Sequence, residues 1–399
     1  MNTTKLIDQA LPAAMPLAPS DEETLLRSTV AGIVAKYGHE YYRKKSLTGE
    51  PMQELWDELG RQGFLGLNIP EEFGGGGVGL SHLAIVLEEM SAGGCPELAM
   101  VLSQGIAGSA LTRHGTREQQ ERYLPGIASG EIKFAFALTE PDAGSNSHNI
   151  TTTATRSDRG WRVRGAKYYI SGIDHSDYFL LVARTGQDST TGKGKVSLFV
   201  VETDIPGLTK EPIATALGAP ERQFSLFFDN VELENDRLVG EVDRGLDPLF
   251  DGLNPERVLS AAISTGIARY ALDKACSYVK QRTVWGNTPI GSYQAVQHPL
   301  AVAAIELEAA RLMARKAAEL FDAGLPAGEQ ANMAKYLASK AGYHSLDTAI
   351  QVHGGNGLAY EFGLADLWGI VRLQQIAPVS TEMVLNYVAQ HTLDLPRSY

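Results

Sequence analysis

The hydrophobic pattern of this 399-residue chain changes its period twice, and this change limits the possible folds more than any other feature. From residue 20 to about residue 129, apolar residues recur at the spacing of amphipathic helices. Ser20 with Glu23 predicts a capping box at the first helix, and further helices are expected over residues 80–92 and 97–114. From about Lys133 they form β-branched and aromatic runs such as KFAFALT and DYFLLVART, separated by turn-prone pieces such as SDRG. From about Leu246, long alanine-rich helical patterns return and continue to the end.

These three regions predict an α+β protein of three domains. We expect an N-terminal α-helical domain over residues 1–129, a middle β domain over 130–240 and a C-terminal four-helix bundle over 241–399. No helical pattern separates the strand runs, so the middle domain should be an antiparallel sheet or barrel. The C-terminal bundle is the better candidate for an oligomer interface.

Composition excludes several classes of protein. The net charge of −12, without a run of Lys or Arg, argues against nucleic acid as a partner. No apolar run approaches the roughly 20 residues that span a bilayer, which argues against a membrane protein. The two cysteines, Cys95 and Cys276, lack disulfide or metal-site spacing, so no metal is expected. The N-terminal stretch has neither signal nor transit features, and we interpret it as a loose tail of a cytoplasmic protein.

Four short motifs interrupt the regular patterns. TEPDAGSN, residues 139–146, follows a strand and offers hydroxyls and backbone N–H groups that can hold a phosphate or a planar polar ligand. YYISG ends another strand, while QRTVWGNTPIGSYQAVQ and QVHGGNG interrupt the later helices with glycine-containing loops. Each motif alone is as well explained by an ordinary turn or strand end.

Together, their order and spacing resemble the acyl-CoA dehydrogenase family over nearly the whole chain. FALTEPDAGSN is followed by KYYISG, then by ERVLSAAISTGIARYALDKACSYVKQRTVWG and finally by IQVHGGNGL. The α, β, α order of the three regions also matches the fold of that family. The resemblance implies flavin adenine dinucleotide (FAD) as cofactor, an acyl-CoA as substrate, an electron-transferring flavoprotein as electron acceptor and a homotetramer, or dimer of dimers, as the assembly.

The resemblance also assigns side chains to the cofactor. Tyr169 stands where many members have Trp beside the flavin, and Ser171 where they have a Thr whose hydroxyl approaches the reactive flavin nitrogen. Ser145 matches a contact to cofactor phosphate or to the substrate, and Ser380 a further cofactor contact. The remaining flavin-ring contacts are Phe136, Leu138 and Thr139. Positions that bind the adenine dinucleotide half across a subunit interface are matched by Arg282, Trp285, Gln351 and Gly355.

The usual catalytic base of the family is missing at its common position. Oxidation of an acyl thioester between its α and β carbons needs a base for the α proton. Many members carry this base as Glu in a Tyr-Glu-Gly-Thr segment near the C-terminus. The matching segment here is QQIAPVSTE, in which Ala377 and Pro378 replace Tyr and Glu. Proline cannot accept a proton, and the following Glu382 is expected in the first turn of a helix as an ordinary stabilising acid.

Glu256 is the predicted replacement. One branch, which includes the isovaleryl-CoA and long-chain acyl-CoA dehydrogenases, places the base at the start of the first C-terminal helix, where Glu256 lies. Asn254 and Pro255 before it are typical of a helix start, so Glu256 also has a purely structural interpretation. A helix N-terminus would lower the pKa of Glu256 and a dry acyl pocket would raise it, and the sequence leaves the outcome open.

The resulting hypothesis is FAD-dependent dehydrogenation of an acyl-CoA to the trans-2-enoyl-CoA with Glu256 as base. Substrate contacts are assigned to Ser145, Asn254, Arg257 and Ala377; Arg257 would contact the pantetheine arm, and the small Ala377 would widen the acyl pocket. The missing C-terminal Glu leaves a flavin-dependent monooxygenase or an enoyl-thioester reductase as alternatives. An acyl-carrier-protein thioester as substrate, and a flavoprotein that binds a partner without turnover, also stay open.

Overall fold

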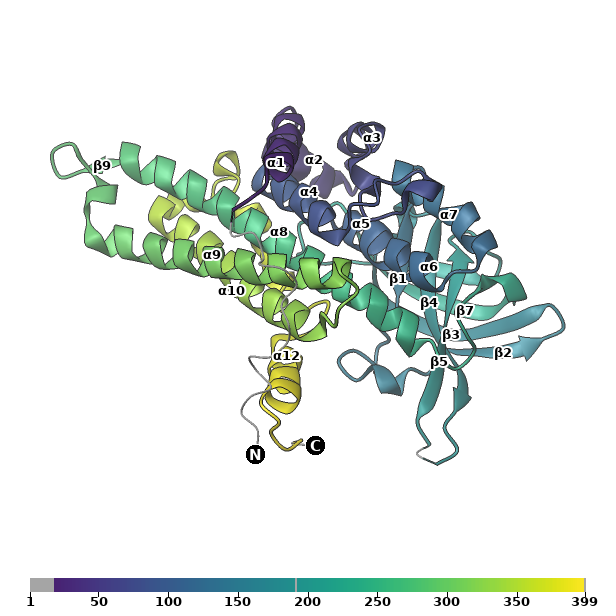
Figure 1. Cartoon of the computed structure of the whole chain (residues 1–399). Helices are drawn as coiled ribbons and strands as arrows, with labels where there is room; N and C mark the ends of the chain where they lie inside the picture. Colours follow the sequence, from purple (N-terminus) through teal and green to yellow (C-terminus); the bar gives the residue numbers. More distant parts are fainter. Residues whose placement is uncertain (1–17, 191, 398–399) are drawn as a thin grey trace.

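The protein is described by a computed structural model that covers residues 18–190 and 192–397. Most of the N-terminal tail predicted from the sequence falls within the first 17 residues, outside the described ones. Figure 1 shows the sheet at one end of the molecule, next to helices from the start of the chain, and the long helices from its end extending away toward the β9 hairpin. The predicted fold class, α-helical, β and α-helical in order, is therefore confirmed.

The N-terminal helices follow the predicted apolar spacing. Ser20 caps the first helix as predicted: its Oγ accepts from the Glu23 N–H at 3.1 Å, and Glu23 Oε2 accepts from the Ser20 N–H at 2.8 Å. The helix predicted over residues 97–114 contains a π-helical segment, η4 (Val101–Gly108), a type often found at functional sites. The other helices are α1 (Asp21–Val34), α2 (Gly38–Thr48), α3 (Gln53–Arg61), α4 (Leu80–Ala92), α5 (Leu98–Met100), α6 (Ser109–His114) and α7 (Arg117–Ser129).

Eight strands form one sheet in the middle of the chain. They are β1 (Phe134–Ala137), β2 (Thr153–Ser157), β3 (Gly160–Ser171), β4 (Tyr178–Gln187), β5 (Gly194–Glu202), β6 (Leu208–Ile213), β7 (Gln223–Glu234) and β8 (Leu238–Val239). Their order is β6-β7-β3-β2-β4-β5-β8, and β1 pairs with β4. Both β1 and β2 run parallel to β4, whereas the other pairs are antiparallel. The prediction of a purely antiparallel sheet is therefore wrong for the pairs that β1 and β2 make with β4. The connection after β3 crosses over β2, so that β4 lies on the other side of β2 from β3.

Both faces of the sheet are buried at β4, which explains the unbroken apolar run YFLLVA. Phe179 and Leu181 of β4 belong to one apolar cluster within the β domain. The alternate residues Leu180 and Val182 join a second cluster with Phe134 and the N-terminal helices α6 and α7. Because successive side chains of a strand point to opposite faces, a strand buried on both faces is continuously apolar.

Three long helices dominate the C-terminal domain: α8 (Leu246–Gln281), α9 (Gln294–Asp322) and α10 (Gly328–His353). A small hairpin of β9 (Thr283–Val284) and β10 (Thr288–Pro289) joins α8 to α9, and the short helices α11 (Trp368–Leu373) and α12 (Thr381–Tyr387) follow α10. The fourth long helix packed against α8 and α9 is α4 from the N-terminal domain. The helical bundle is thus completed across the domain boundary.

Both cysteines, Cys95 and Cys276, are free thiols. Over residues 18–190 and 192–397, no helix is both long and apolar enough to cross a bilayer. Within the same residues, no group of three His, Cys, Asp or Glu side chains is arranged to hold a metal ion.

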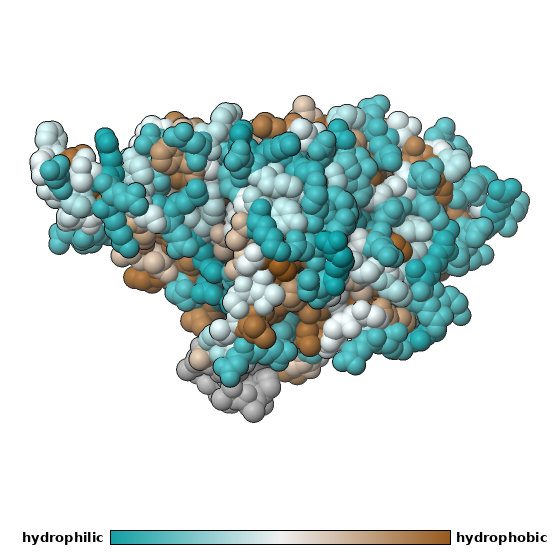
Figure 2. All heavy atoms as spheres, turned by 90° about the horizontal axis from the view of Figure 1, so that it is seen from above, coloured by the Kyte–Doolittle hydropathy of each residue, from teal (hydrophilic) through white to brown (hydrophobic). Residues whose placement is uncertain are grey.

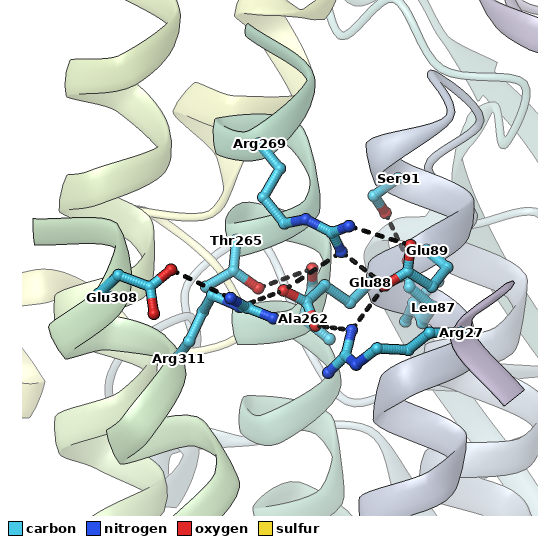
Figure 3. A network of polar contacts seen from close by, with 10 residues as sticks. All are labelled: Arg27, Leu87, Glu88, Glu89, Ser91, Ala262, Thr265, Arg269, Glu308 and Arg311. Carbon is cyan, nitrogen blue, oxygen red and sulfur yellow. Dashed lines mark hydrogen bonds and ion pairs between the residues drawn. The ribbon is translucent and has the colours of Figure 1, made fainter. Parts of the chain in front are cut away.

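An ion network connects α1, α4, α8 and α9 (Figure 3). Glu88 and Glu89 of α4 are buried, and three guanidinium groups converge on them. Arg27 contacts both carboxylates at 2.7 and 2.6 Å, Arg269 contacts Glu89 at 2.6 Å, and Arg311 contacts Glu88 at 2.7 Å. Burial alone would raise the pKa of Glu88, but these arginines hold it below its usual value. The network therefore fixes the N-terminal domain to the long helices.

We expect Glu88→Gln to lower the free energy of unfolding by about 3 kcal/mol, because it removes a buried carboxylate that is the counter-charge of partly buried guanidinium groups. Urea denaturation followed by circular dichroism measures this loss. Glu308→Gln is the matched control: Glu308 also pairs with Arg311, at 3.0 Å, but its side chain is 65% exposed. That control should change stability by less than about 1 kcal/mol. Equal effects of the two substitutions would contradict a structural role for the buried network.

Candidate active site

The structure places the predicted cofactor residues in two distant groups. The first, at the sheet, consists of Phe136, Leu138, Thr139, Ser145, Tyr169 and Ser171. The second, at the far ends of α8 and α10, consists of Arg282, Trp285, Gln351 and Gly355. Figure 1 shows the β9 hairpin and the sheet at opposite ends of the molecule. From Glu256 to Gln281, α8 alone rises about 38 Å, so the two groups lie far apart within one chain.

A buried ion pair fixes the loop after β1. Lys167 of β3 contacts Glu140 at 2.9 Å, and both side chains are almost completely buried. Glu140 also accepts hydrogen bonds from the N–H groups of Thr151 and Thr152 at 2.7 and 3.0 Å. Thr139 O accepts from Tyr168 N at 2.8 Å. The predicted flavin contacts on β1 and β3 are thereby held side by side.

Tyr169 has the geometry expected of a ligand-facing aromatic side chain. The pairing of β3 with β7 is irregular between Lys167 and Ile170, and Tyr169 lies in this bulge with a φ of 57°. Its side chain is 52% exposed and packs against Tyr168, with 4.3 Å between ring centroids. A positive φ at a bulky residue is strained, and such strain clusters at ligand sites. This exposed aromatic face fits a planar ring such as that of a flavin.

Ser171 follows at the end of β3. Its Oγ and the side chain of Gln223 exchange hydrogen bonds at 3.1 and 2.9 Å. The hydroxyl is thus held in place by a buried amide. Ser145, in contrast, is exposed in the loop beyond Glu140.

The second group is highly exposed. Trp285 is 89% exposed with a φ of 46°, in the turn between β9 and β10. Arg282, Gln351 and Gly355 are exposed as well. The whole group, including the large indole ring of Trp285, is therefore accessible to a ligand or to another chain.

Glu256 lies in the interior of α8 and not at its start. The helix begins at Leu246 after Gly245, so Glu256 is about three turns inside it. The predicted helix start at Asn254 is therefore wrong. The first turns of α8 pack against η4 and α6, and Gly252 lies close to Ile106. This tertiary packing outweighs the local capping signal.

One oxygen of the Glu256 carboxyl group is shielded from water, although the residue as a whole is half-buried. Its Oε2 exposes less than 1 Å² and has no hydrogen-bond partner among the described residues. Burial raises the pKa of Glu256 to about 7, and the charges of Arg257 and Lys335 limit the rise. Because the helix N-terminus is distant, its dipole does not offset this desolvation. A carboxyl group that titrates near neutral pH is suited to general base catalysis.

Two buried cations lie beside this carboxyl group. Arg257 Nη1 donates to Asn254 Oδ1 at 2.9 Å, while its Nε is buried and has no partner among the described residues. Lys335 of α10 donates from Nζ to the carbonyl oxygen of Val379. Burial and the charge of Arg257 lower the pKa of Lys335 to about 8. The site therefore places a carboxyl group whose Oε2 has no hydrogen-bond partner among the described residues beside two cations that have little access to water.

Lys335 also adjoins the segment that replaces the usual base. Ala377 is half-buried in this segment. Ser380 caps α12, and its Oγ accepts from Met383 N at 3.3 Å, which places Glu382 in the first turn as predicted. Glu256 and the segment that contains Pro378 thus come together at Lys335. The assignment of Ser380 and Ala377 to cofactor and substrate stays a prediction.

Lys335, Glu140 and Lys167 were not among the site residues predicted from the sequence. Lys335 lies on the buried face of α10 with Ala331, Ala334 and Ala338, so a lysine at an apolar helix position was the available signal. Glu140 and Lys167 offered no comparable signal, because charged residues near a turn are usually solvated.

Comparisons with known proteins agree with this geometry. Family models for the N-terminal, middle and C-terminal domains of acyl-CoA dehydrogenase match residues 20–131, 135–231 and 243–393. Acyl-CoA dehydrogenase FadE12 of Mycobacterium tuberculosis is 52% identical over 382 residues, which cover 95% of this chain and 98% of that protein. The rat mitochondrial long-chain specific acyl-CoA dehydrogenase is 30% identical, with 93% of this chain and 86% of that protein covered.

Two further similarities concern chemistry and structure. A 3-(aryl)acrylate reductase of Clostridium sporogenes is 32% identical, with 87% of this chain and 92% of that protein covered. The structure of a glutaryl-CoA dehydrogenase in complex with glutaryl-CoA aligns with a TM-score of 0.90 at 28% identity, over 96% of this chain and 98% of that one. The chain belongs to the acyl-CoA dehydrogenase family. This membership confirms the predicted enzyme class and, with it, FAD as the cofactor.

Proposed function

We propose that this chain oxidises an acyl-CoA to the trans-2-enoyl-CoA, with Glu256 as the base that removes the α proton. The observation that carries the proposal is the shielded, unpaired Glu256 carboxyl group beside Arg257 and Lys335. Its pKa of about 7 leaves a substantial fraction deprotonated at neutral pH. The carboxylate therefore accepts a proton there without first losing a strong hydrogen bond.

Each neighbour has a separate role in this proposal. When bound, FAD supplies the acceptor for the β hydride. Arg257 and Lys335 stabilise the carboxylate form of Glu256 against desolvation. The buried Nε of Arg257, which has no partner among the described residues, is a donor for the pantetheine arm of CoA. Asn254 orients that guanidinium group through its hydrogen bond to Nη1.

We propose that two chains share each cofactor site. The sheet group of one chain would hold the flavin, and Arg282, Trp285, Gln351 and Gly355 of another chain would hold the adenine dinucleotide half. The distance along α8 supports this arrangement, as do the exposed apolar side chains Val302, Ile305 and Leu312 on α9. Figure 2 shows hydrophobic surface, in brown, along one edge of an otherwise mostly hydrophilic face. Buried between chains, such surface favours the proposed homotetramer.

Family membership supports the proposed electron acceptor, and the sequence of the N-terminal stretch is the basis for the proposed location. We propose an electron-transferring flavoprotein as acceptor and a cytoplasmic location. The free thiols of Cys95 and Cys276 are compatible with a reducing compartment.

Anaerobic titration of the FAD-loaded protein with straight and branched acyl-CoAs tests the proposal. We expect the visible flavin band to bleach with at least one acyl-CoA and the enoyl-CoA to appear. Bleaching by no acyl-CoA or acyl-carrier-protein thioester would overturn the proposed reaction. A second titration starts from dithionite-reduced protein and enoyl-CoA, because one relative is named a reductase. Faster reoxidation by enoyl-CoA than reduction by acyl-CoA would reverse the assigned direction.

A further inference from the structure

A second polar site lies at a cavity between the N-terminal helices and the sheet. The cavity is lined by apolar and charged side chains together, among them Met52, Trp56, Phe134, Glu97, Lys133 and Glu221. Its volume is about 20 Å³ for the centres of water-sized molecules. That volume accepts one water molecule or one hydroxyl group between otherwise packed walls.

Two carboxyl groups meet at this cavity. Glu97 and Glu221 are only 5% and 6% exposed. Burial and the neighbouring charge of Glu221 raise the pKa of Glu97 well above its usual value, which favours the protonated, neutral form of Glu97. Glu221 Oε1 accepts from the N–H groups of Leu98 and Ala99 at 2.6 and 3.1 Å.

The second carboxylate oxygen of Glu221, Oε2, can accept a further hydrogen bond. Apart from the acid proton that Glu97 holds, no donor among the described residues reaches the buried Oε2. A carboxylate oxygen has two lone-pair sites, so at least one remains unfilled. Leaving such a group buried without a donor is costly, which indicates a ligand or an ordered water at this position.

The ammonium group of Lys133 affects which charged ligand groups can bind in the cavity. Its Nζ donates to Gln53 Oε1 at 2.6 Å and lies 4.8 Å from the centroid of the Trp56 ring. Burial lowers the pKa of Lys133, and the negative charges of the surrounding carboxylates oppose this shift. The ammonium group disfavours a second cation in the cavity, and the Glu221 carboxylate disfavours an anion.

The cavity adjoins the flavin end of the active site. Ser171, the side chain assigned to the flavin edge, contributes to its lining. Gln223 connects Ser171 to Glu221: its Nε2 donates to Ser171 Oγ at 2.9 Å and lies 3.2 Å from the Glu221 carbonyl oxygen. Leu102 on η4 lines the cavity as well, and η4 packs against α8, which carries Glu256. The cavity therefore adjoins both Ser171, which is assigned to the flavin edge, and the η4 segment that packs against the helix of Glu256.

We propose that Glu97 and Glu221 form a subsite for a hydroxyl group on the acyl chain, beyond its β carbon, so that the preferred substrates are hydroxylated acyl-CoAs. This inference rests on the proposed function. A hydroxyl group donates to Glu221 Oε2 and accepts the proton of Glu97, which satisfies both groups. A methyl end leaves Glu221 without a further donor, whereas ammonium and carboxylate ends meet a like charge in Lys133 or Glu221.

Calorimetric titration of FAD-loaded protein that carries Glu256→Gln measures acyl-CoA binding without turnover. The probes are hexanoyl-CoA with 6-hydroxyhexanoyl-CoA and octanoyl-CoA with 8-hydroxyoctanoyl-CoA. We expect at least one hydroxylated probe to bind about tenfold more tightly than its unsubstituted partner. Adding Glu221→Gln, which keeps an acceptor for Leu98 and Ala99, should reduce that ratio to about twofold or less. Glu97→Gln is the second variant, and Glu232→Gln, at a half-buried position on β7 that does not line the cavity, is the control that should keep the full ratio.

Three results would overturn the subsite. They are equal binding of both members of each pair, a preference that survives both substitutions, and tighter binding of 6-aminohexanoyl-CoA or adipoyl-CoA. Flavin bleaching of protein with Glu256 intact separates this inference from the proposed function. Bleaching without a hydroxyl preference refutes the subsite alone, whereas no bleaching by any thioester refutes the reaction first.

Discussion

Glu256→Gln protein should bind FAD and acyl-CoA but reduce its flavin about a thousandfold more slowly than the wild type. The amide keeps the size of the carboxyl group but cannot accept the α proton, and positioned general bases contribute about 10²–10⁴-fold to rates. No described carboxylate occupies the C-terminal position that other members use, because Pro378 stands there. The protein therefore has no second base in that segment to replace Glu256.

Stopped-flow measurement of flavin reduction under anaerobic conditions gives this rate. Glu382→Gln is the matched control, because Glu382 lies on the neighbouring segment as an exposed helix-start acid. It should reduce flavin at the wild-type rate. Normal flavin reduction in Glu256→Gln protein would refute the assignment of the base.

The pH dependence of the same rate provides a second view of Glu256. The folded protein raises the pKa of Glu256 to about 7, and only the carboxylate form acts as a base. The wild-type rate should therefore be constant well above pH 7 and fall about tenfold for each pH unit below it. Burial determines the pH at which the rate begins to fall. A base with an ordinary carboxyl pKa would keep its full rate down to about pH 5.

The sequence singled out Glu256 as the candidate base but did not predict its position inside a helix or its burial. Both depend on contacts between segments that are distant in the chain. Asn254 and Pro255 are local signals for a helix start, and local signals compete poorly with the packing of α8 on η4. Once the helix extends toward the sheet, the carboxyl group lies in its interior. Desolvation then determines its pKa, a result that no local pattern contains.

Other parts of the prediction held because they depend on short-range patterns. The apolar spacing of α1 and α4 and the Ser20 capping box arise within a few residues, and the structure shows them as predicted. Glu97 and Glu221, in contrast, come from segments far apart in the chain. Each looked like an ordinary solvated acid, and only the closure of the N-terminal helices on the sheet buries them together.

Co-expression of two inactive variants should restore about a quarter of the wild-type flavin reduction if chains share the cofactor site. One variant is Glu256→Gln, and the other is Arg282→Glu, which places a negative charge where the dinucleotide phosphates are expected. In a mixed pair, one site carries both defects. The other site combines Glu256 of one chain with Arg282 of its partner and is intact. Random pairing makes about half of the pairs mixed, with one intact site of two in each.

Single-turnover flavin reduction of the purified mixture, with differently tagged chains, measures this recovery. Each variant alone is the control and should be nearly inactive, Glu256→Gln for lack of a base and Arg282→Glu for weak FAD binding. If each chain held its cofactor alone, the mixture would stay as inactive as its components. The exposed Trp285 and Arg282 would then need another explanation, because about 38 Å of α8 separates them from Glu256 within one chain.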